Sequence, residues 1–511
     1  MPLRAWFARA GVQPGAPGVK AVRVPVGDWL NVARDVAASG GRLLALWGSG
    51  DGTGSAVVRA SYLAPQGVLL VTLPLETPAA GYPSLEEVFP AAGRMQRAIA
   101  DMMGLAPTGS LDSRPWLRHS GWPPNFRPLV DENPPAGEAC SDSYEFVRVE
   151  GDGVHEIPVG PVHAGIIEPG HFRFSVVGEK VLRLEERLGY VHKGIERRFT
   201  ELPILEGHRL AARVSGDSAV AFAWGYCQAL EGMARADIPP RAHFLRALFL
   251  ELERIANHLG DLGALGNDAG FAFGLAQFSR LKEELLRTNS RVMGQRYLMD
   301  AVVPGGTARD LTPNGPAQIR VCLTAIASEV ATLRDIYDEH EGVRDRFNGA
   351  GTVSPELAAR LGLLGLAGRA SGQDVDVRCD LPCEPYSRMV VKKVIRTEGD
   401  VAARVAVRFD EFQESYRLVQ ELLAGIPAGP HHTPIEPPAD GEIGTGLIEG
   451  WRGPVWIALE AGPAGSIRRC HPHDPSWQNW PVLEHAIIGN IVPDFPLINK
   501  SFNLSYSGHD L

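Results

Sequence analysis

Histidines and carboxylates recur in short polar strings in the middle of the chain, and these residue types carry protons in proteins. His163, Glu168 and His171 share one Gly- and Pro-containing segment, and His192 and Glu196 follow soon after. Burial and neighbouring charges tune the pKa of such groups towards neutrality, which general acid–base transfer requires. The strings therefore mark candidates for proton transfer. The alternative is that they are hydrogen-bonded structural groups.

Cysteines offer little support for a metal site. The six cysteines are scattered, and only Cys379 and Cys383 lie close together. No second pair and no histidines at zinc-site spacing accompany them, so a plain loop is favoured there. A chain of this length with six cysteines has no disulfide framework, and a reducing cytoplasm is the simpler setting.

A Ser-Gly-Asp-Ser step, Ser215 to Ser218, precedes the apolar run 219–230. This pattern is typical of a helix N-terminus with capping residues. The helix dipole would favour an anion or a polarised carbonyl at that point. Capping alone explains the same residues equally well.

Two proline-rich stretches, residues 121–136 and 426–439, divide the chain, because proline fits neither a helix interior nor a central strand. Residues 1–120 are predicted to form a small α/β domain, followed by a Pro-rich linker over 121–144. Short apolar runs predict its strands, and a longer run predicts its helix: 42–47, 56–63, 68–73 and 92–103.

Residues 145–511 are predicted to form one mainly helical bundle domain with a β-rich entry and a β/loop C-terminal segment. The entry is a strand pair that turns near Gly178. Apolar residues at spacings of four and three predict one face of a long helix over 244–262, and helices are also expected at 211–234, 277–288 and 401–423. Strands at 455–460 and 466–470 precede expected loop material. The fold class is α+β, multidomain.

The overall charge and hydropathy argue against nucleic-acid binding and against a membrane-spanning helix. The formal net charge is -10, which argues against a nucleic-acid binder, since such proteins need a basic face. No apolar stretch reaches the length of a spanning helix, and the first eleven residues carry no secretory signal. Membrane association is therefore expected only through partner subunits.

Several strings carry a family resemblance. Their order and spacing are similar to those of the large subunit of membrane-bound nickel–iron (NiFe) hydrogenases of the formate hydrogenlyase type, and of the homologous quinone-pocket subunit of complex I. The resemblance covers residues 155–511, and residues 82–90 resemble the small companion subunit fused ahead of it in some members. The strings lie at 160–173, 189–196, 253–261, 369–378 and 474–477.

The resemblance implies four cysteine ligands for a nickel–iron centre, and none is present. The matching positions are Ser215, Ser218, Ser505 and Gly508. A serine hydroxyl is a hard donor that does not ionise near neutral pH, whereas nickel bridged to iron needs soft thiolates. We therefore expect no metal centre and no hydrogenase activity.

The resemblance also implies a histidine and a tyrosine at the quinone headgroup, as in complex I. Counting without gaps places these positions on Ile167 and Gly216, so quinone binding by that pair is excluded. Quinone binding by other groups stays open.

Around the altered centre, the resemblance places a polar cluster. Glu168, Glu196 and Asp217 are the predicted proton-transfer residues, and the remaining pocket residues are His163, His171, His192, Arg213, Ser215, Ser218, Ser505 and Gly508. Arg254, His258 and Asp261 share one helix and are expected to form a local ion pair. The pairs His431–His432 and His471–His473 are expected in surface loops.

Two functions follow from the resemblance. In the first, the chain is the peripheral-arm subunit of a complex that passes electrons from an iron–sulfur partner to a quinone-like acceptor and moves ions. In the second, it is a non-catalytic coupling scaffold whose pocket is filled by Phe222, Tyr226, Phe502 and Tyr506. The expected partners are a small iron–sulfur subunit, a ferredoxin-like subunit, and channel-like and antiporter-like membrane subunits, at the cytoplasmic face of the inner membrane.

Overall fold

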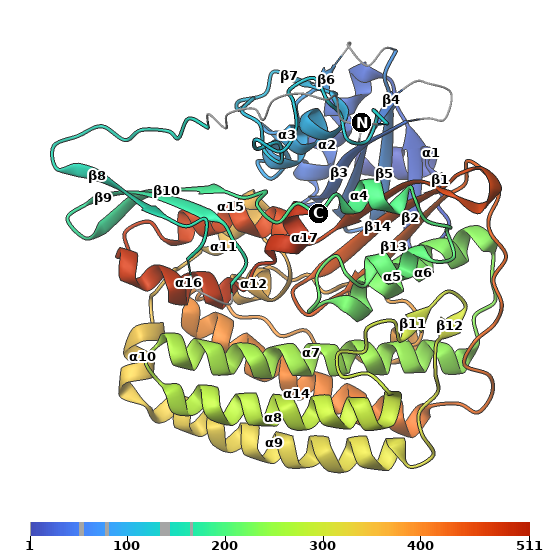
Figure 1. The fold of residues 1–511 in the computed structure, drawn as a ribbon, viewed down its shortest axis with the longest axis vertical. Helices are drawn as coiled ribbons and strands as arrows, with labels where there is room; N and C mark the ends of the chain where they lie inside the picture. Colours follow the sequence, from blue (N-terminus) through green and yellow to red (C-terminus); the bar gives the residue numbers. More distant parts are fainter. Residues whose placement is uncertain (1, 51–55, 77–80, 133–143, 164–166) are drawn as a thin grey trace.

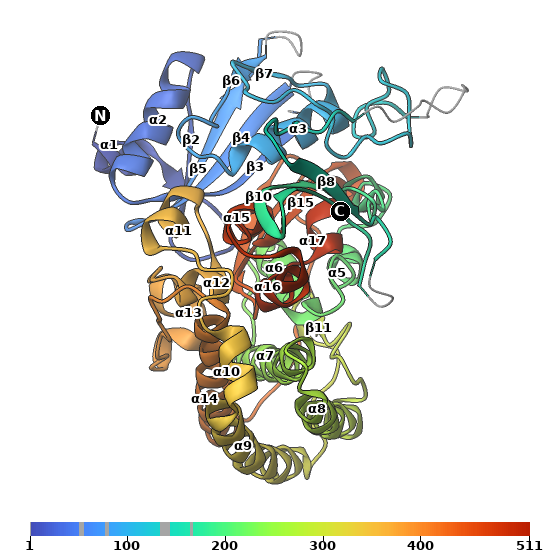
Figure 2. The ribbon, with the colours of Figure 1, turned by 90° about the vertical axis from the view of Figure 1, so that its left-hand side faces the viewer.

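The computed structural model describes residues 2–50, 56–76, 81–132, 144–163 and 167–511. Residues 133–143 of the predicted linker, with Cys140, lie outside the described residues, as do residues 164–166 of the first motif. Figures 1 and 2 show an N-terminal sheet at one end of the molecule and a stack of long helices at the other. The C-terminal strands and short helices lie between them.

The N-terminal part is a five-stranded sheet with order β1-β2-β5-β4-β3. β3, β4 and β5 form an antiparallel meander, and β2 pairs parallel with β5. The predicted strands and the helix at 92–103 are confirmed, and two further helices accompany them. The elements are α1 (Leu3–Arg9), β1 (Gly11–Val12), β2 (Val19–Arg23), α2 (Val26–Ala38), β3 (Arg42–Gly50), β4 (Ala56–Ala64), β5 (Gly67–Pro74) and α3 (Ala92–Met103).

The N-terminal sheet shares a core with the C-terminal strands. One buried cluster joins Trp47 of β3 and Leu70 of β5 to Leu447 and Trp456. Because strand side chains alternate between faces, the residues on this face pack against the second sheet while those on the other face pack under α2 and α3. The sheet is therefore held on both faces.

A three-stranded antiparallel sheet opens the large domain, with order β10-β9-β8. β8 (Val154–Val159), β9 (His171–Val177) and β10 (Lys180–Arg187) form it, and the last two are joined at Gly178. Gly178 has φ of 58°, a left-handed conformation that glycine adopts without cost. The predicted strand pair is confirmed, with β8 as an unpredicted third strand.

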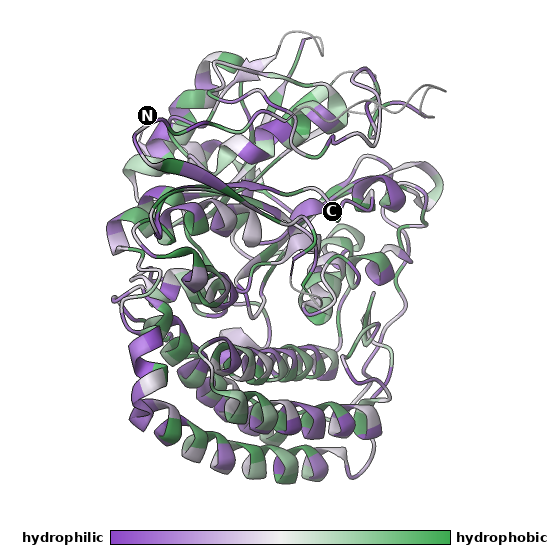
Figure 3. Ribbon diagram, turned by 60° about the vertical axis from the view of Figure 1, so that its left-hand side comes forward, coloured by the Kyte–Doolittle hydropathy of each residue, from purple (hydrophilic) through white to green (hydrophobic). Residues whose placement is uncertain are grey.

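Four long helices form the far end of the molecule (Figure 1). They are α7 (Pro240–Asp268), α8 (Ala272–Met293), α9 (Gly315–Glu339) and α14 (Val401–Gly425). The apolar stripe predicted on α7 is buried throughout, and α7 packs on both α8 and α14. In Figure 3 these helices are banded green and purple, as expected of amphipathic helices. α9 was not predicted, although its buried residues Ile319, Leu323, Ile326 and Val330 repeat at spacings of four and three.

Shorter elements connect the two ends. α6 (Ala219–Ala234) packs on the C-terminal sheet, which consists of β13 (Ile443–Glu449), β14 (Pro454–Ala461) and β15 (Ile467–His473). The other short elements are α4 (Ile195–Phe199), α5 (Gly207–Ala211), β11 (Val302–Val303), β12 (Gly306–Thr307), α10 (Glu341–Phe347), α11 (Pro355–Leu361), α12 (Gly365–Ala370) and α13 (Val377–Asp380).

The chain end was expected to be loop, and this expectation is wrong. α15 (Ser476–Ala486), α16 (Phe495–Phe502) and α17 (Tyr506–Asp510) follow β15. Each is too short to show a helical repeat in the sequence, and Pro481 lies inside α15. His471 and His473 are also not in a surface loop, because they lie on β15 and are buried.

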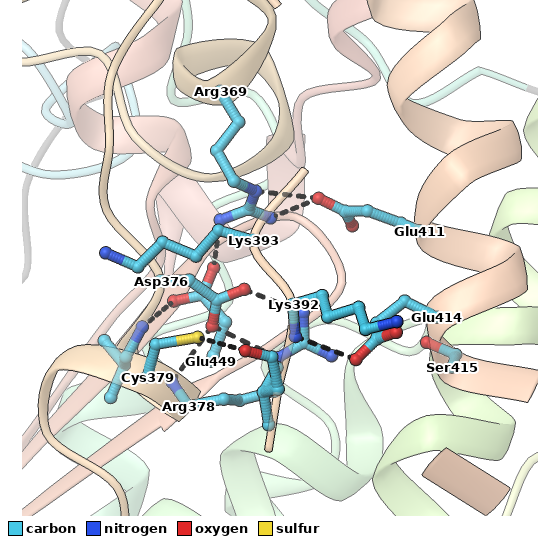
Figure 4. A network of polar contacts seen from close by, with 12 residues as sticks. Arg369, Asp376, Arg378, Cys379, Lys392, Lys393, Glu411, Glu414, Ser415 and Glu449 are labelled. Atoms are coloured by element: carbon cyan, nitrogen blue, oxygen red, sulfur yellow. Dashed lines mark hydrogen bonds and ion pairs between the residues drawn. The ribbon is translucent and has the colours of Figure 1, made fainter. Parts of the chain in front are cut away.

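A buried charge network ties the segment 365–380 to the long helices (Figure 4). Arg369 donates to Glu411 at 2.7 Å and to Glu449 at 2.8 Å. Glu411 also bonds to Arg254 at 3.3 Å and to His258 at 3.2 Å. Because these contacts join α7, α12, α14 and β13, the network fixes the relative positions of four elements.

The expected local ion pair on α7 is therefore wrong. Arg254 and His258 both reach Glu411 of α14, and Asp261 bonds to Arg408 of α14 at 2.9 Å. Spacings of four and three put the three side chains on one face, and that face packs against another charged helix.

Among the described residues, no helix is both long enough and apolar enough to cross a bilayer.

Candidate active site

Two hydroxyl groups meet where the resemblance places metal ligands. Ser215 Oγ lies 2.9 Å from Ser505 Oγ, and Ser505 Oγ accepts the N–H of Gly508 at 2.8 Å. Ser215 also donates to Asp217 at 2.7 Å, and Ser218 lies 3.5 Å from the same carboxylate. We call Ser215, Ser218, Ser505 and Gly508 the serine site. The fold thus brings together two segments that lie 290 residues apart.

Helix starts position both halves of the serine site. Ser505 is the N-cap of α17, and its side chain accepts the backbone N–H of Gly508. Ser218 is the N-cap of α6, but its side chain makes no capping bond. Glu253 of α7 replaces it, accepting the amides of Val220 at 2.7 Å and Ala221 at 3.3 Å. The capping interpretation of the Ser215–Ser218 step therefore fails for Ser218, whereas Ser505 is a cap that the sequence did not predict.

A buried arginine closes one side of the serine site. Arg452, in the turn between β13 and β14, bonds to Asp217 at 2.6 Å and to Ser218 at 3.4 Å. Burial raises the pKa of Asp217, but the Arg452 guanidinium and the Ser215 hydroxyl outweigh it and lower this pKa to about 2. Asp217 is therefore a carboxylate held by a guanidinium.

The serine site does not fit a nickel–iron centre. Ser215 and Ser505 hydrogen-bond to each other at 2.9 Å, and their hydroxyls are hard donors where nickel and iron need soft thiolates. A Cβ on Gly508 would lie 2.7 Å from Asp474 Oδ2, so a side chain there would collide with that carboxylate. In the part of the chain that the structure describes, no group of three or more His, Cys, Asp or Glu residues could hold a metal ion.

A cavity of about 210 Å³ adjoins the start of α6, and we call it the α6 cavity. Gly216 and Asp217 line it on one side and Glu253 on another. Burial raises the pKa of Glu253 to about 8, although the two amides that it accepts oppose the shift. Near neutral pH this carboxyl is therefore largely protonated. The remaining lining residues are Ala256, Asn257, Lys282, Leu286, Asn289, Arg296, Tyr297 and Leu298.

Lys282 supplies a positive charge to the α6 cavity. Its ammonium has no ion pair or hydrogen bond with any residue in the described ranges. A Cβ on Gly260 would lie 2.8 Å from Lys282 Nζ, so the absence of a side chain at Gly260 leaves room for it. Arg296, in contrast, is held by Glu283 at 2.6 Å. The cavity thus combines a proton donor, an uncommitted cation and apolar walls, which is the usual composition of a small-molecule site.

The three predicted proton-transfer residues do not share one site. Asp217 lies in the serine site, whereas Glu168 is exposed and accepts the N–H of Ser507 at 3.1 Å. Glu196 is buried elsewhere, bonded to Arg469 at 2.6 Å and to His471 at 2.7 Å. Burial raises the pKa of Glu196, but Arg469 and His471 lower it to about 2.

The predicted histidines and Arg213 are dispersed around the serine site. His163 lies beside Tyr506 with ring centroids 6.2 Å apart, and His171 bonds to the Gly160 carbonyl at 3.3 Å. His192 bonds to the carbonyl of Asp510 at 2.7 Å. Arg213 instead turns to the surface, where it pairs with Asp300 at 2.6 Å.

Sequence reasoning gave no role to Glu253, Lys282 and Arg452. Glu253 lies inside one of the family strings, but nothing in the sequence shows that it caps a helix from another element. Arg452 lies in a short turn and Lys282 on an amphipathic helix, where a charged residue ordinarily faces solvent. For Arg452, the sequence offered one signal: the string Gly450-Trp451-Arg452-Gly453 places two large side chains in a turn between glycines.

Known proteins match both parts of the chain. Residues 23–139 match the family described as "Respiratory-chain NADH dehydrogenase, 30 Kd subunit", and residues 268–442 match the "49 Kd subunit". Formate hydrogenlyase subunit 5 of Escherichia coli is 31% identical over 84% of this chain and 77% of that protein. The fused C/D protein of the NADH-quinone oxidoreductase of Bacteroides fragilis is 27% identical over 78% of each chain.

A solved structure supports the fold. A chain of the membrane-bound sulfane sulfur reductase, an archaeal respiratory membrane complex, superposes with a TM-score of 0.66 over 70% of this chain and 99% of its own, at 22% identity. The sequence matches identify the chain as a member of the family that unites the large subunits of hydrogenase complexes with the 30 and 49 kDa subunits of respiratory NADH dehydrogenase.

Proposed function

We propose that this chain is a peripheral subunit of a membrane-bound oxidoreductase complex, and that a quinone-like acceptor is reduced in the α6 cavity. Electrons would come from an iron–sulfur cluster in a partner subunit. The observation that carries the proposal is the α6 cavity itself, with the protonated Glu253 beside the uncommitted Lys282. No hydrogenase step is included, since the serine site lacks thiolates.

The chemistry follows from these groups. Reduction of a quinone to a quinol consumes two electrons and two protons. Glu253 can give a proton to a reduced carbonyl oxygen and regain it from solvent, because a pKa near 8 suits transfer near neutral pH. Lys282 stabilises negative charge as it develops on that oxygen.

The family supplies the proposed assembly. The chain would dock a small iron–sulfur subunit and a ferredoxin-like subunit, and would reach channel-like and antiporter-like membrane subunits at the cytoplasmic face of the inner membrane. Acceptor reduction would then drive ion movement in the membrane partners. Relatives named as parts of formate hydrogenlyase and of NADH-quinone oxidoreductase support this placement.

A second function, the non-catalytic scaffold, is favoured by one observation. Ser215 and Ser505, at two of the positions that the resemblance assigns to metal ligands, hydrogen-bond to each other at 2.9 Å. Two of the aromatic rings expected to fill the pocket are engaged elsewhere, because Tyr226 donates to the Ile204 carbonyl and Phe502 lies under Arg404. The scaffold function requires that substitutions in the α6 cavity leave electron transfer unchanged.

Measuring quinone reduction by the purified complex distinguishes the catalytic function from the scaffold function. Lys282→Met should raise the KM for a soluble quinone analogue at least about tenfold, because a charge interaction with the reduced oxygen is lost. Lys180→Met, on the exposed end of β10, is the matched control. A wild-type complex that reduces no quinone, or a Lys282→Met complex with unchanged kinetics, would support the scaffold instead.

A further inference from the structure

A second cavity, of about 510 Å³, lies beside the α6 cavity, and we call it the arginine cavity. The guanidinium groups of Arg209, Arg213 and Arg309 line it, and Asp300 is the one carboxylate among its described lining residues. His208 also lines it but adds no charge near neutral pH, because burial lowers its pKa. The lining thus carries two more positive than negative charges, in a chain whose net charge is -10.

The turn over residues 295–301 stands between the two cavities. Residues 296–298 line the α6 cavity, whereas residue 295 and residues 299–301 line the arginine cavity. None of the described residues lines both cavities. An occupant of the arginine cavity therefore uses groups that the proposed acceptor does not contact.

The Asp300 carboxylate neutralises one of the three arginines. Arg213 donates to its two oxygens, at 2.6 Å and 2.8 Å. These hydrogen bonds lower the pKa of Asp300, so it is ionised near neutral pH. The Arg213–Asp300 pair carries no net charge, and the positive charge of the cavity therefore comes from Arg209 and Arg309.

These two guanidinium groups are available to a ligand. Arg209 pairs with Glu206 at 3.0 Å, but both side chains are exposed, and such surface pairs are weak. Arg309 has no side-chain hydrogen bond or ion pair with any residue in the described ranges. A Cβ on Gly294 would lie 2.5 Å from Arg309 Nη1, so this glycine leaves the room that the guanidinium occupies.

Apolar side chains form the rest of the arginine cavity. Phe249 and Met293 are buried, and Met299 and Val303 are half-buried, at its wall. Methionine side chains are flexible and polarisable, so they adapt to the shape of a ligand. The volume lies within the range of roughly 300–1,000 Å³ that is usual for small-molecule sites.

We propose that the arginine cavity binds a small organic anion, namely an apolar body that carries a carboxylate, sulfonate or phosphate group. The anionic group pairs with Arg309 and Arg209, because a guanidinium presents two parallel N–H donors to the oxygens of such a group. The apolar body packs against Phe249, Met293 and Met299. This site is distinct from the α6 cavity, so it goes beyond the proposed function and does not depend on it.

The binding of three probes to the purified complex tests the chemistry of the ligand. Naphthalene-2-sulfonate has both the charge and the apolar body, inorganic sulfate has only the charge, and 2-naphthylmethanol has only the body. Isothermal titration calorimetry should show saturable binding of the sulfonate, one molecule per chain. The other two probes should bind at least about tenfold more weakly, because each makes only half of the contacts.

Two substitutions with opposite effects locate the binding in the arginine cavity. Arg309→Met keeps most of the side-chain volume but removes the charge, and it should raise the Kd for the sulfonate at least about tenfold. Asp300→Asn removes the carboxylate that repels the ligand and frees Arg213, so it should lower the Kd at least about threefold. A misfolded variant cannot bind more tightly, so this gain is decisive. Arg344→Met, at an exposed position of α10, is the control and should match the wild type.

Four outcomes would overturn the proposal. They are the absence of saturable sulfonate binding to the wild-type complex, equal binding of sulfate and the sulfonate, an unchanged Kd in both Arg309→Met and Asp300→Asn, and a structure of the complex in which a partner's side chain fills the cavity. Each of them leaves the proposed function intact. Quinone reduction should be unchanged in Arg309→Met, and failure of the wild-type complex to reduce quinone would refute the proposed function without affecting the anion site.

Discussion

Two carboxyl groups beside the start of α6 are held in opposite protonation states. Asp217 is ionised because Arg452 and Ser215 stabilise its charge, whereas burial leaves Glu253 with a pKa of about 8. When the pKa values of two neighbouring acids differ in this way, one acid carries a negative charge and the other can donate a proton. Here Asp217 carries the charge and Glu253 is the proton donor. At this scale the site is defined by protonation rather than by metal coordination.

Glu253→Gln should change how stability depends on pH. The folded-state pKa of Glu253 is raised, so its contribution to stability is fully present below its ordinary pKa and declines as the pH rises towards about 8. Across that window the wild type should lose stability relative to the variant, by at most about 1.4 kcal/mol per pH unit. Urea unfolding at pH 5, 6.5 and 8 measures the difference. The exposed Glu206→Gln is the control, and parallel curves for wild type and Glu253→Gln would contradict the assignment.

Asp217→Asn should destabilise the chain by leaving the Arg452 guanidinium buried without its counter-charge. Arg452 is 3% exposed, but Asp217 is partly open to solvent, so the expected loss is about 1–2 kcal/mol. Denaturant midpoints at constant slope measure it. Asp338→Asn, in an exposed pair with Arg334, should change stability by less than about 0.5 kcal/mol. Equal losses of unfolding free energy in the two variants would show that the buried pair stabilises the protein no more than the exposed pair does.

At the scale of elements, α17 docks through hydrogen bonds to backbone amides rather than through a long apolar face. Ser505 caps the helix, Asp510 accepts the N–H of Val191 at 3.0 Å, and the Leu511 carbonyl accepts the amides of Lys193 and Ile195. Such a helix depends on close packing at its first turn, where Gly508 meets Asp474.

Gly508→Ala should therefore disturb the docking of α17. Its Cβ would lie 2.7 Å from Asp474 Oδ2 and 2.9 Å from Ser505 Oγ, both in the interior. Overpacking of this kind costs about 1–3 kcal/mol, and a thermal melt should show the loss. Gly27→Ala in α2, where a Cβ meets open space, should instead gain up to about 1 kcal/mol from helix propensity. A stable Gly508→Ala protein would mean that the helix can shift freely.

Glu411→Gln should loosen the contact between α14 and its neighbours. Glu411 is 1% exposed and is shared by Arg369, Arg254 and His258, so neutralising it removes a buried counter-charge from two arginines, each of which keeps one other carboxylate. The expected cost is about 3–5 kcal/mol, measured by denaturant unfolding. Glu421→Gln, in an exposed pair with Arg417, is the control. A small effect would mean that water or a neighbouring acid takes over the role.

The elements also show what the sequence could predict. Long amphipathic segments such as α7 and α14 were predicted because their apolar residues repeat over several turns. The serine site was located because its flanking strings resemble those of known ligand segments. The roles of Glu253 and the burial of His471 and His473 were not foreseen, since both depend on contacts between elements far apart in the chain. The string His471-Pro-His473 also resembles a loop in the sequence.

For the whole molecule, the N-terminal sheet and the large domain share a buried apolar core. Trp47 and Leu70 meet Leu447 and Trp456, and Gly15 bridges to Thr445. A chain cut between them would expose these aromatic surfaces.

Residues 145–511 expressed alone should therefore aggregate or elute as a soluble oligomer, because an uncovered apolar face of this size seeks a partner. Co-expression with residues 1–132 should restore a monodisperse complex in size-exclusion chromatography. A well-folded monomer of residues 145–511 would show that the linker joins two independently stable domains.

The direct contact of Ser215 with Ser505 has a practical consequence for production of the protein. A hydrogen bond between two hydroxyls joins two distant segments of the large domain. A metal cluster bound by thiolates would instead need its ions delivered and inserted during maturation. Expression in nickel-depleted medium, in a host without maturation enzymes, should then yield the same native chain, with a melting temperature that chelators do not shift.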